Sequence, residues 1–271
     1  MAIYVGIITQ TRQLHPGMGL RQIWELTHPP MGRDAFMEIG MYAGLGQKTP
    51  QKPTRTTFSV KSNRYKNLLI GQHFTSVNQL WVCDITYFQD KQANTYYLFF
   101  LMDAYSRRIL GYSAADNLRA INATNTLKMA MKTRNMKDYK HQLIHHSDRG
   151  TQYIANEYTQ ILDNANIKIS MCLSALENAY VERVHGTIKN QYLIHRPIDS
   201  LKSLQDWLKK DVHSYNYLRP HTSLKGMTPV DFENFLSTIP INQRTKMSVF
   251  TNISDAKAKS DSNQLSLFCS I

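Results

Sequence analysis

The stretch from residue 145 to residue 189 limits the possible folds of this chain more than any other part. It begins within a segment, 142–146, that is predicted to form a strand and leads into a turn at Arg149 and Gly150. It ends in a segment that is amphipathic with the period of a helix. The apolar side of that helix carries Tyr180, Val181, Val184, Ile188 and Tyr192, and the polar side carries Asn178, Glu182, His185, Gly186 and Lys189.

The polar side of this helix has an unusual composition. It combines a carboxylate, an imidazole and an ammonium group, whereas an ordinary solvated face alternates Glu and Lys. Gly186 lies on the same side, although glycine inside a helix costs about 1 kcal/mol relative to alanine. We therefore expect another group to approach the helix closely at Gly186.

Composition limits the partners and the compartment. The chain has 271 residues and a formal net charge of +12, which favours a polyanionic partner such as nucleic acid over a merely basic protein. Its three cysteines are too scattered for a disulfide framework or a zinc site, and neither CxxC nor HExxH occurs. We expect no signal peptide and no membrane span, and hence a bacterial cytoplasmic location. The cysteines are Cys83, Cys172 and Cys269.

Five segments follow one another along the chain. Residues 1–47 predict a small helical domain, either a helix-turn-helix that reads DNA or a plain helical hairpin, with Asp34 capping its second helix. Residues 48–75 form a basic linker that either follows a phosphate backbone or is a solvated tether. An α/β core is predicted at 76–198, a helical C-terminal extension at 199–239, and a polar, flexible tail at 240–271.

The core has the pattern of a mixed α/β layer. Strands are predicted at 80–88, 96–102 and 107–113, and the short turns between them imply an antiparallel meander. Strand, helix and strand then alternate from residue 120 to residue 172. In the extension, Asp199 or Ser200 is expected to cap a helix at 201–217, and Thr228 a later one.

Three carboxylates stand where a metal site is expected. Asp84 interrupts an apolar strand, Asp148 follows a strand, and Glu182 lies on the polar side of the helix. Each alone has an ordinary explanation as a ladder end, a turn cap or an ion-pair partner. Together, without a histidine or thiol partner, they suit two Mg²⁺ or Mn²⁺ ions, which activate a nucleophile and stabilise the leaving oxygen of a phosphodiester. Asp103 is a rival for Asp84, but we expect it to organise a turn or to pair with Arg107 or Arg108.

At this point the sequence resembles a known family, the OrfB-type transposases of bacterial insertion sequences, whose DDE catalytic core is similar to that of retroviral integrases. The resemblance covers about residues 13–236, and its weakest part is LHPGMGLR at 14–21. Five ordered motifs carry it: WVCDITY at 81–87, DAYSRRILG at 103–111, HSDRGTQY at 146–153, the residues NA, E and GTIK between 178 and 189, and YNYLRPH at 215–221 followed by Leu224, Gly226, Thr228 and Pro229.

Two departures from the family pattern affect the region before Glu182. Only 33 residues separate Asp148 from Glu182, slightly fewer than is usual, and the shortening falls between Ser170 and Glu177. Glu177 also stands where the family often has Asp. Neither departure removes a catalytic carboxylate, but the loop concerned contacts DNA in integrases, so the handling of target DNA is expected to differ.

The resemblance implies an RNase H-like fold and metal-dependent cleavage of DNA followed by transfer of the 3′ hydroxyl to another phosphodiester. By resemblance, Asp84 would bridge two Mg²⁺ ions, and Asp148 and Glu182 would hold one each. The DNA contacts implied or expected are Lys189, His185, Arg149, Arg219 and His221. Such enzymes act as homo-oligomers on paired element ends and target DNA, and some depend on a DNA-binding protein from an upstream reading frame.

Two other classes of function stay open from the residues. One is a metal-dependent nuclease of the same fold that never joins DNA ends. The other is a DNA-binding transposase subunit that is inactive without its upstream-frame partner. The intact set of three carboxylates favours an active enzyme over a decayed one.

Overall fold

The computed structural model describes residues 1–47, 65–136, 141–172 and 179–249. The chain divides into two compact units. The first consists of Met1–Thr56, Gln89–Asn94 and Val184–Phe232, and the second consists of Thr57–Phe88, Thr95–Arg183 and Glu233–Ile271. Most of the predicted linker, 48–64, lies outside the described residues, as do Glu177 and the rest of 173–178.

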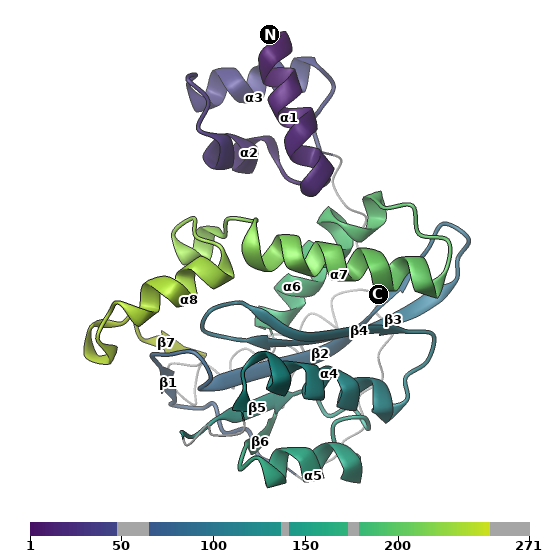
Figure 1. The fold of residues 1–271 in the computed structure, drawn as a ribbon, viewed down its shortest axis with the longest axis vertical. Coiled ribbons are helices and arrows are strands. Elements are labelled where there is room, and N and C mark those ends of the chain that lie inside the picture. Colours follow the sequence, from purple (N-terminus) through teal and green to yellow (C-terminus); the bar gives the residue numbers. More distant parts are fainter. Residues whose placement is uncertain (48–64, 137–140, 173–178, 250–271) are drawn as a thin grey trace, which may run out of the picture. The chain divides into compact units, whose positions relative to one another are not determined.

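The second unit is built on a mixed five-stranded sheet (Figure 1). Its strands are β2 (Leu80–Gln89), β3 (Thr95–Asp103), β4 (Ile109–Ala115), β5 (Ile144–Ser147) and β6 (Lys168–Met171). The order across the sheet is β4-β3-β2-β5-β6, with β3 antiparallel to β4, and β5 parallel to both β2 and β6. The mixed α/β prediction is confirmed, and this order is the RNase H-like arrangement that the resemblance implied.

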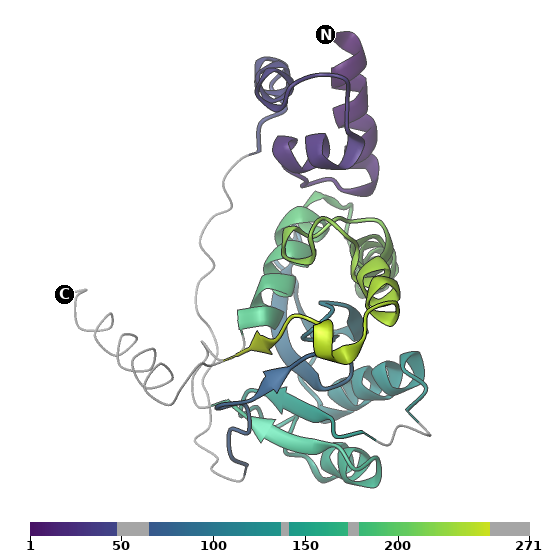
Figure 2. The same ribbon diagram turned by 90° about the vertical axis from the view of Figure 1, so that its left-hand side faces the viewer.

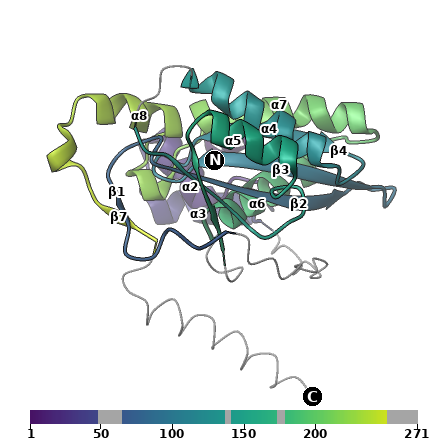
Figure 3. The same cartoon turned by 90° about the horizontal axis from the view of Figure 1, so that it is seen from below.

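Two helices, α4 (Ala120–Thr133) and α5 (Asn156–Asn164), cover one face of this sheet (Figure 3). Side chains alternate along a strand, so Trp81 and Cys83 share a face and join the core beneath these helices. Gly111 brings β4 against α4, because an added Cβ there would lie 2.1 Å from the carbonyl oxygen of Thr126. On the opposite face Val82 and Phe100 are also buried, as expected for central strands of an α/β sheet.

A short two-stranded sheet brings the C-terminal end of the described chain back to this unit. Strands β1 (His73–Phe74) and β7 (Met247–Ser248) pair antiparallel, and η5 (Ile241–Gln243) precedes β7 (Figure 2). Residues 240–249 were predicted to begin a flexible tail, but they contain η5 and β7. The rest of that predicted tail, 250–271, lies outside the described residues.

The first unit begins with three helices that share a small core. They are α1 (Ala2–Leu14), α2 (Leu20–Thr27) and α3 (Arg33–Tyr42). Their core is formed by Ile8, Met18, Leu20, Ile23 and Phe36. Gly32, rather than Asp34, is the N-cap of α3; Asp34 lies in the first turn, where its negative charge favours the helix dipole.

The remaining elements are α6 (Ala179–Gln191), η3 (Leu193–His195), α7 (Leu201–Tyr217), η4 (Thr222–Leu224) and α8 (Pro229–Ser237). The predicted cap of α7 is confirmed, because the Ser200 hydroxyl accepts a hydrogen bond from the Ser203 amide at 3.2 Å. Thr228 likewise accepts from the Asp231 amide at 3.1 Å at the start of α8. Among the described helices, none combines the length and the apolar character that a membrane span requires.

Candidate active site

Asp84 lies in the middle of β2, as the sequence predicted. It follows four buried residues of the strand and is itself partly buried. Its carboxylate accepts a hydrogen bond from the adjacent Ile85 amide at 2.9 Å. A carboxylate at this depth is disfavoured unless a cation or further donors face it.

Asp148 lies beside Asp84, directly after the end of β5. The parallel pairing of β2 and β5 sets Cys83 opposite Ser147, and the two aspartates are the next residues of the two chains. The Asp148 carboxylate accepts a hydrogen bond from the Gly150 amide at 3.0 Å, which fixes it at the start of the turn. The two carboxylates therefore lie side by side at adjacent parallel strands. Ligand sites in α/β sheets usually lie near the carboxyl ends of such strands.

Glu182 lies in the first turn of α6 and is exposed. A negative charge at this end of a helix interacts favourably with the helix dipole. The residues that lead into α6, 173–178, are outside the described part of the chain. Glu182 is thus presented by a helix, whereas the two aspartates are presented by the sheet.

Electrostatics join the three carboxylates into one site. The pKa of Asp84 is raised well above its usual value, first by burial, then by the negative charge of Asp148 and, more weakly, by that of Glu182. Burial also raises the pKa of Asp148, against the opposing effect of its hydrogen bond from Gly150. The structure brings the three predicted carboxylates close enough to repel one another.

The donor chemistry of this site fits divalent cations. It offers carboxylate oxygens without thiol or imidazole, which is the preference of Mg²⁺ and Mn²⁺, and a cation would relieve the repulsion that raises the pKa of Asp84. Within the described residues, however, no three acidic, histidine or cysteine side chains are already arranged as a complete metal-binding cluster.

A buried polar cluster that sequence reasoning did not find lies directly behind the carboxylates. The Nε2 atom of His145 lies 2.8 Å from the Tyr158 hydroxyl and 3.1 Å from the Cys83 sulfur. Burial lowers the pKa of His145 to about 4, so the imidazole is neutral at pH 7. Cys83 precedes Asp84 and His145 belongs to β5, so this cluster links the two strands that carry the aspartates.

Asp103, the rival of Asp84, has a structural role. It is fully buried at the end of β3, and its carboxylate accepts hydrogen bonds from the amides of Tyr105 and Ser106, each at 3.0 Å. The prediction that it organises the turn is confirmed. The alternative was an ion pair with Arg107 or Arg108; the ion pair found for Asp103 is with Arg134 at 3.6 Å, from the end of α4.

The five expected DNA contacts differ in exposure. Lys189, Arg149 and His221 are partly buried, and burial lowers the pKa of Lys189. His185 and Arg219 are only 7% and 4% exposed, which argues against the expected contact with DNA. Tertiary packing explains the difference for Arg219, whose guanidinium donates to the Gln22 side chain at 3.3 Å.

No described atom of the chain fills the space beside Gly186. A Cβ added there would have no neighbour within 4 Å, apart from the backbone of its own helix turn. The group that the sequence led us to expect close to Gly186 is therefore not among the described residues, and the expectation stays a prediction.

Family models identify the central part of the chain. Two models described as "Integrase core domain" match residues 75–174 and residues 164–229. The first match contains β2 to β6, and hence Asp84 and Asp148. The second contains α6 to the start of α8, and hence Glu182 and Lys189.

Curated relatives extend the match beyond this core. The chain is 30% identical over 226 residues to a putative transposase for the insertion sequence element IS986/IS6110 of Mycobacterium tuberculosis, covering 79% of this chain and 81% of that protein. It is 31% identical over 236 residues to the putative transposase InsK of the insertion sequence element IS150 of Escherichia coli K12, covering 79% and 82%.

Among solved structures, the HTLV-2 integrase catalytic core domain in complex with magnesium aligns at 21% identity with a TM-score of 0.46, over 62% of this chain and 99% of that chain. The family assignment rests on the sequence matches, which reach 30% identity and cover more than two thirds of both chains. The chain therefore belongs to the insertion-sequence transposases that carry an integrase core domain.

Proposed function

We propose that this transposase cuts DNA at the ends of an insertion sequence and joins the freed 3′ hydroxyl to a target phosphodiester, with Asp84, Asp148 and Glu182 as its catalytic carboxylates. The observation that carries the proposal is the parallel pairing of β2 with β5, which sets Asp84 beside Asp148, together with the effect of the Glu182 charge on Asp84. Membership of a transposase family with an integrase core supports the same reaction.

The carboxylates would act by holding two divalent cations. By the order of the family motifs, Asp84 would be shared between the two ions, and Asp148 and Glu182 would hold one each. When bound, such ions lower the pKa of a water or hydroxyl nucleophile and stabilise the leaving oxygen of the phosphodiester. The backbone donors at Ile85 and Gly150 hold the two aspartates in place before any cation binds.

The DNA would lie along the side of α6 that carries Glu182 and Lys189. Glu182 and Lys189 are two turns apart on this helix, and positions seven apart share one face. The open space at Gly186, between them, would allow a DNA backbone to approach. Arg149 and His221 remain candidate DNA contacts. We further propose that the enzyme acts as a homo-oligomer on paired element ends, in the bacterial cytoplasm.

The test of this proposal is one set of isosteric variants. D84N, D148N and E182Q should each lower strand transfer of an end-mimicking duplex into plasmid DNA by about 10³-fold or more, because each removes a ligand of ions that contribute several kcal/mol. Binding of the same duplex, measured by fluorescence anisotropy, should stay near that of the parent. Activity should also disappear on chelation and return with Mg²⁺ or Mn²⁺.

D163N is the matched control, since Asp163 is an exposed carboxylate on α5, away from the site. It should keep the activity of the parent. Near-normal strand transfer by any of the three site variants would show that this residue is not a catalytic carboxylate. Cleaved but never joined products from the parent would instead identify a nuclease of the same fold.

A further inference from the structure

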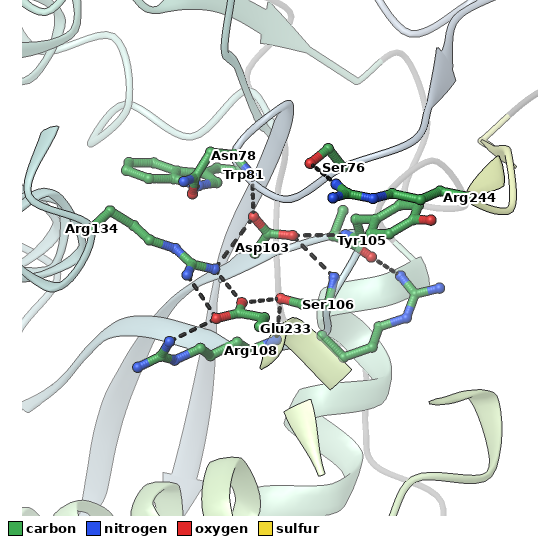
Figure 4. Close-up of polar contacts among 12 residues, drawn as sticks. Ser76, Asn78, Trp81, Asp103, Tyr105, Ser106, Arg108, Arg134, Glu233 and Arg244 are labelled. Carbon is green, nitrogen blue, oxygen red and sulfur yellow. Dashed lines mark hydrogen bonds and ion pairs between the residues drawn. The ribbon is translucent and has the colours of Figure 1, made fainter. Parts of the chain in front are cut away.

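A network of buried charges holds the turn between β3 and β4 (Figure 4). Glu233, from α8, accepts hydrogen bonds from the Ser106 hydroxyl at 2.6 Å and from Arg108 at 2.7 Å. It also accepts from Arg134, which pairs with Asp103. Burial alone would raise the pKa of Glu233, but the hydrogen bond and charge of Arg134 leave it lowered. Glu233 therefore stays ionised, whereas burial raises the pKa of Asp103; the two carboxylates hold both sides of the turn through their hydrogen bonds.

Arg107 lies between Ser106 and Arg108, and its backbone conformation is unusual. Its φ of 63° lies in the left-handed region, which costs a residue other than glycine of order 1 kcal/mol or more. The hydrogen bonds of Ser106 and Arg108 to Glu233 hold the chain in this conformation. A conformation held against its own preference points to a role for the Arg107 side chain.

The Arg107 side chain extends to the helix that carries Glu182. Its guanidinium carbon lies 3.9 Å from the centre of the Tyr180 ring, a close cation–π contact. The same guanidinium donates to the carbonyl oxygen of Ala104 and lies 3.8 Å from the sulfur of Met247 on β7. The contacts with Ala104 and Met247 therefore hold the guanidinium in place, with its flat face against the Tyr180 ring.

Tyr180 belongs to the first turn of α6, two residues before Glu182. The first turn of a helix lacks the full set of backbone hydrogen bonds and is the part that frays most readily. A cation near this end is unfavourable for the helix dipole, so dipole energetics do not explain why Arg107 lies here. Stacking on Tyr180 explains it, because the contact fixes the turn from which Glu182 projects.

We infer that Arg107 is a positioning residue for Glu182: by stacking on Tyr180 it orders the first turn of α6 and sets the direction of the Glu182 carboxylate toward Asp84 and Asp148. This inference rests on the proposed function, in which Glu182 is a catalytic carboxylate. The charged network of Asp103, Arg134 and Glu233 supports Arg107 from behind and contacts no reacting group itself.

The test separates the flat guanidinium from its charge. R107K keeps the charge but loses the planar face, and Y180L removes the ring, whereas Y180F keeps it. In R107K and Y180L, amide hydrogen exchange over residues 180–183 should be roughly five- to thirtyfold faster than in the parent, without added metal. Strand transfer should fall by a similar factor, and the R107K/Y180L double variant should be no worse than either single one.

Controls separate this role from a general loss of structure or of DNA binding. Exchange in α4 and anisotropy with an end-mimicking duplex should be unchanged, and R119K, at an exposed arginine before α4, should behave as the parent. Parent-like exchange and activity in both R107K and Y180L would overturn the inference. So would a loss of activity in R107K alone, since that would indicate direct contact with DNA. If E182Q were active, the proposed function itself would fail, whatever R107K showed.

Discussion

His15 shows what burial does to a single residue of the first unit. It is 3% exposed, and its Nδ1 lies 2.8 Å from the hydroxyl of Tyr192. Burial, helped by the positive charges of Arg219 and Arg196, lowers the pKa of His15 to about 4. The imidazole is therefore neutral in the folded chain at pH 7.

This lowered pKa predicts a loss of stability in acid. The folded pKa lies below the unfolded value of about 6.5, so the unfolded chain binds the proton first as the pH falls. The stability contributed by neutral His15 is complete above pH 6.5 and is lost progressively toward pH 4. Between pH 7 and pH 5 we expect a loss of about 2 kcal/mol from this residue, measured by urea unfolding.

H15N is the informative variant for this prediction. It keeps a polar group near Tyr192 but removes the titrating imidazole. The variant should be less stable than the parent at pH 7, yet its free energy of unfolding should change less between pH 7 and pH 5, by about the same 2 kcal/mol. An equal pH dependence in both proteins would assign the acid sensitivity to other groups.

At the scale of one element, α6 combines a metal ligand and a DNA surface in the proposed function. A substitution at Gly186 can test the DNA-binding role separately from an effect on stability, because the two are expected to change in opposite directions. G186A should raise the free energy of unfolding by about 0.5–1 kcal/mol, because alanine is the better helix former and the added Cβ meets nothing. It should also weaken binding of an end-mimicking duplex, because the methyl group occupies the space that the DNA backbone would use.

K189E completes the same experiment on α6. It places a negative charge against phosphates and should reduce binding of element ends strongly, whereas K189R keeps the charge and should be tolerated better. Thermal unfolding checks that neither change destroys the fold, since Lys189 is partly buried. Parent-like binding by both G186A and K189E would show that this side of α6 is an ordinary solvated surface.

At the scale of the whole molecule, we expect the excess of positive charge to set the salt dependence of DNA binding. Residues 48–66 contain six Lys and Arg and no acidic residue. Neutralising a side chain that binds one phosphate should flatten the dependence of log affinity on log salt by about 0.9, so replacing all six by Gln should reduce the slope by up to about five. Anisotropy titrations across a range of salt concentrations measure this slope. The six are Lys48, Lys52, Arg55, Lys61, Arg64 and Lys66.

A matched control for this charge experiment lies on α4. Lys128 and Lys132 are exposed there, and their replacement by Gln should change the slope little if DNA follows the basic linker. Equal slopes for the parent and the six-residue variant would show that the linker is a solvated tether.

Features that depend on neighbours within a few residues were predictable from the sequence alone. The apolar residues placed Asp84 inside a strand, the turn signal placed Asp148 after one, and the cap of α7 was narrowed to Asp199 or Ser200, of which the structure uses Ser200. Periodicity, capping and turn chemistry act over one or two turns of chain, so they can be read directly. The family motifs added the order of the three carboxylates.

Only the tertiary structure decided which polar groups are buried and which partners they have. Arg134, rather than Arg107 or Arg108, pairs with Asp103, and Glu233 reaches the same turn from α8. Long-range packing also buried His185, although its helical position alone predicted exposure. Desolvation and ion pairing depend on distances between elements far apart in the chain, which no local pattern contains.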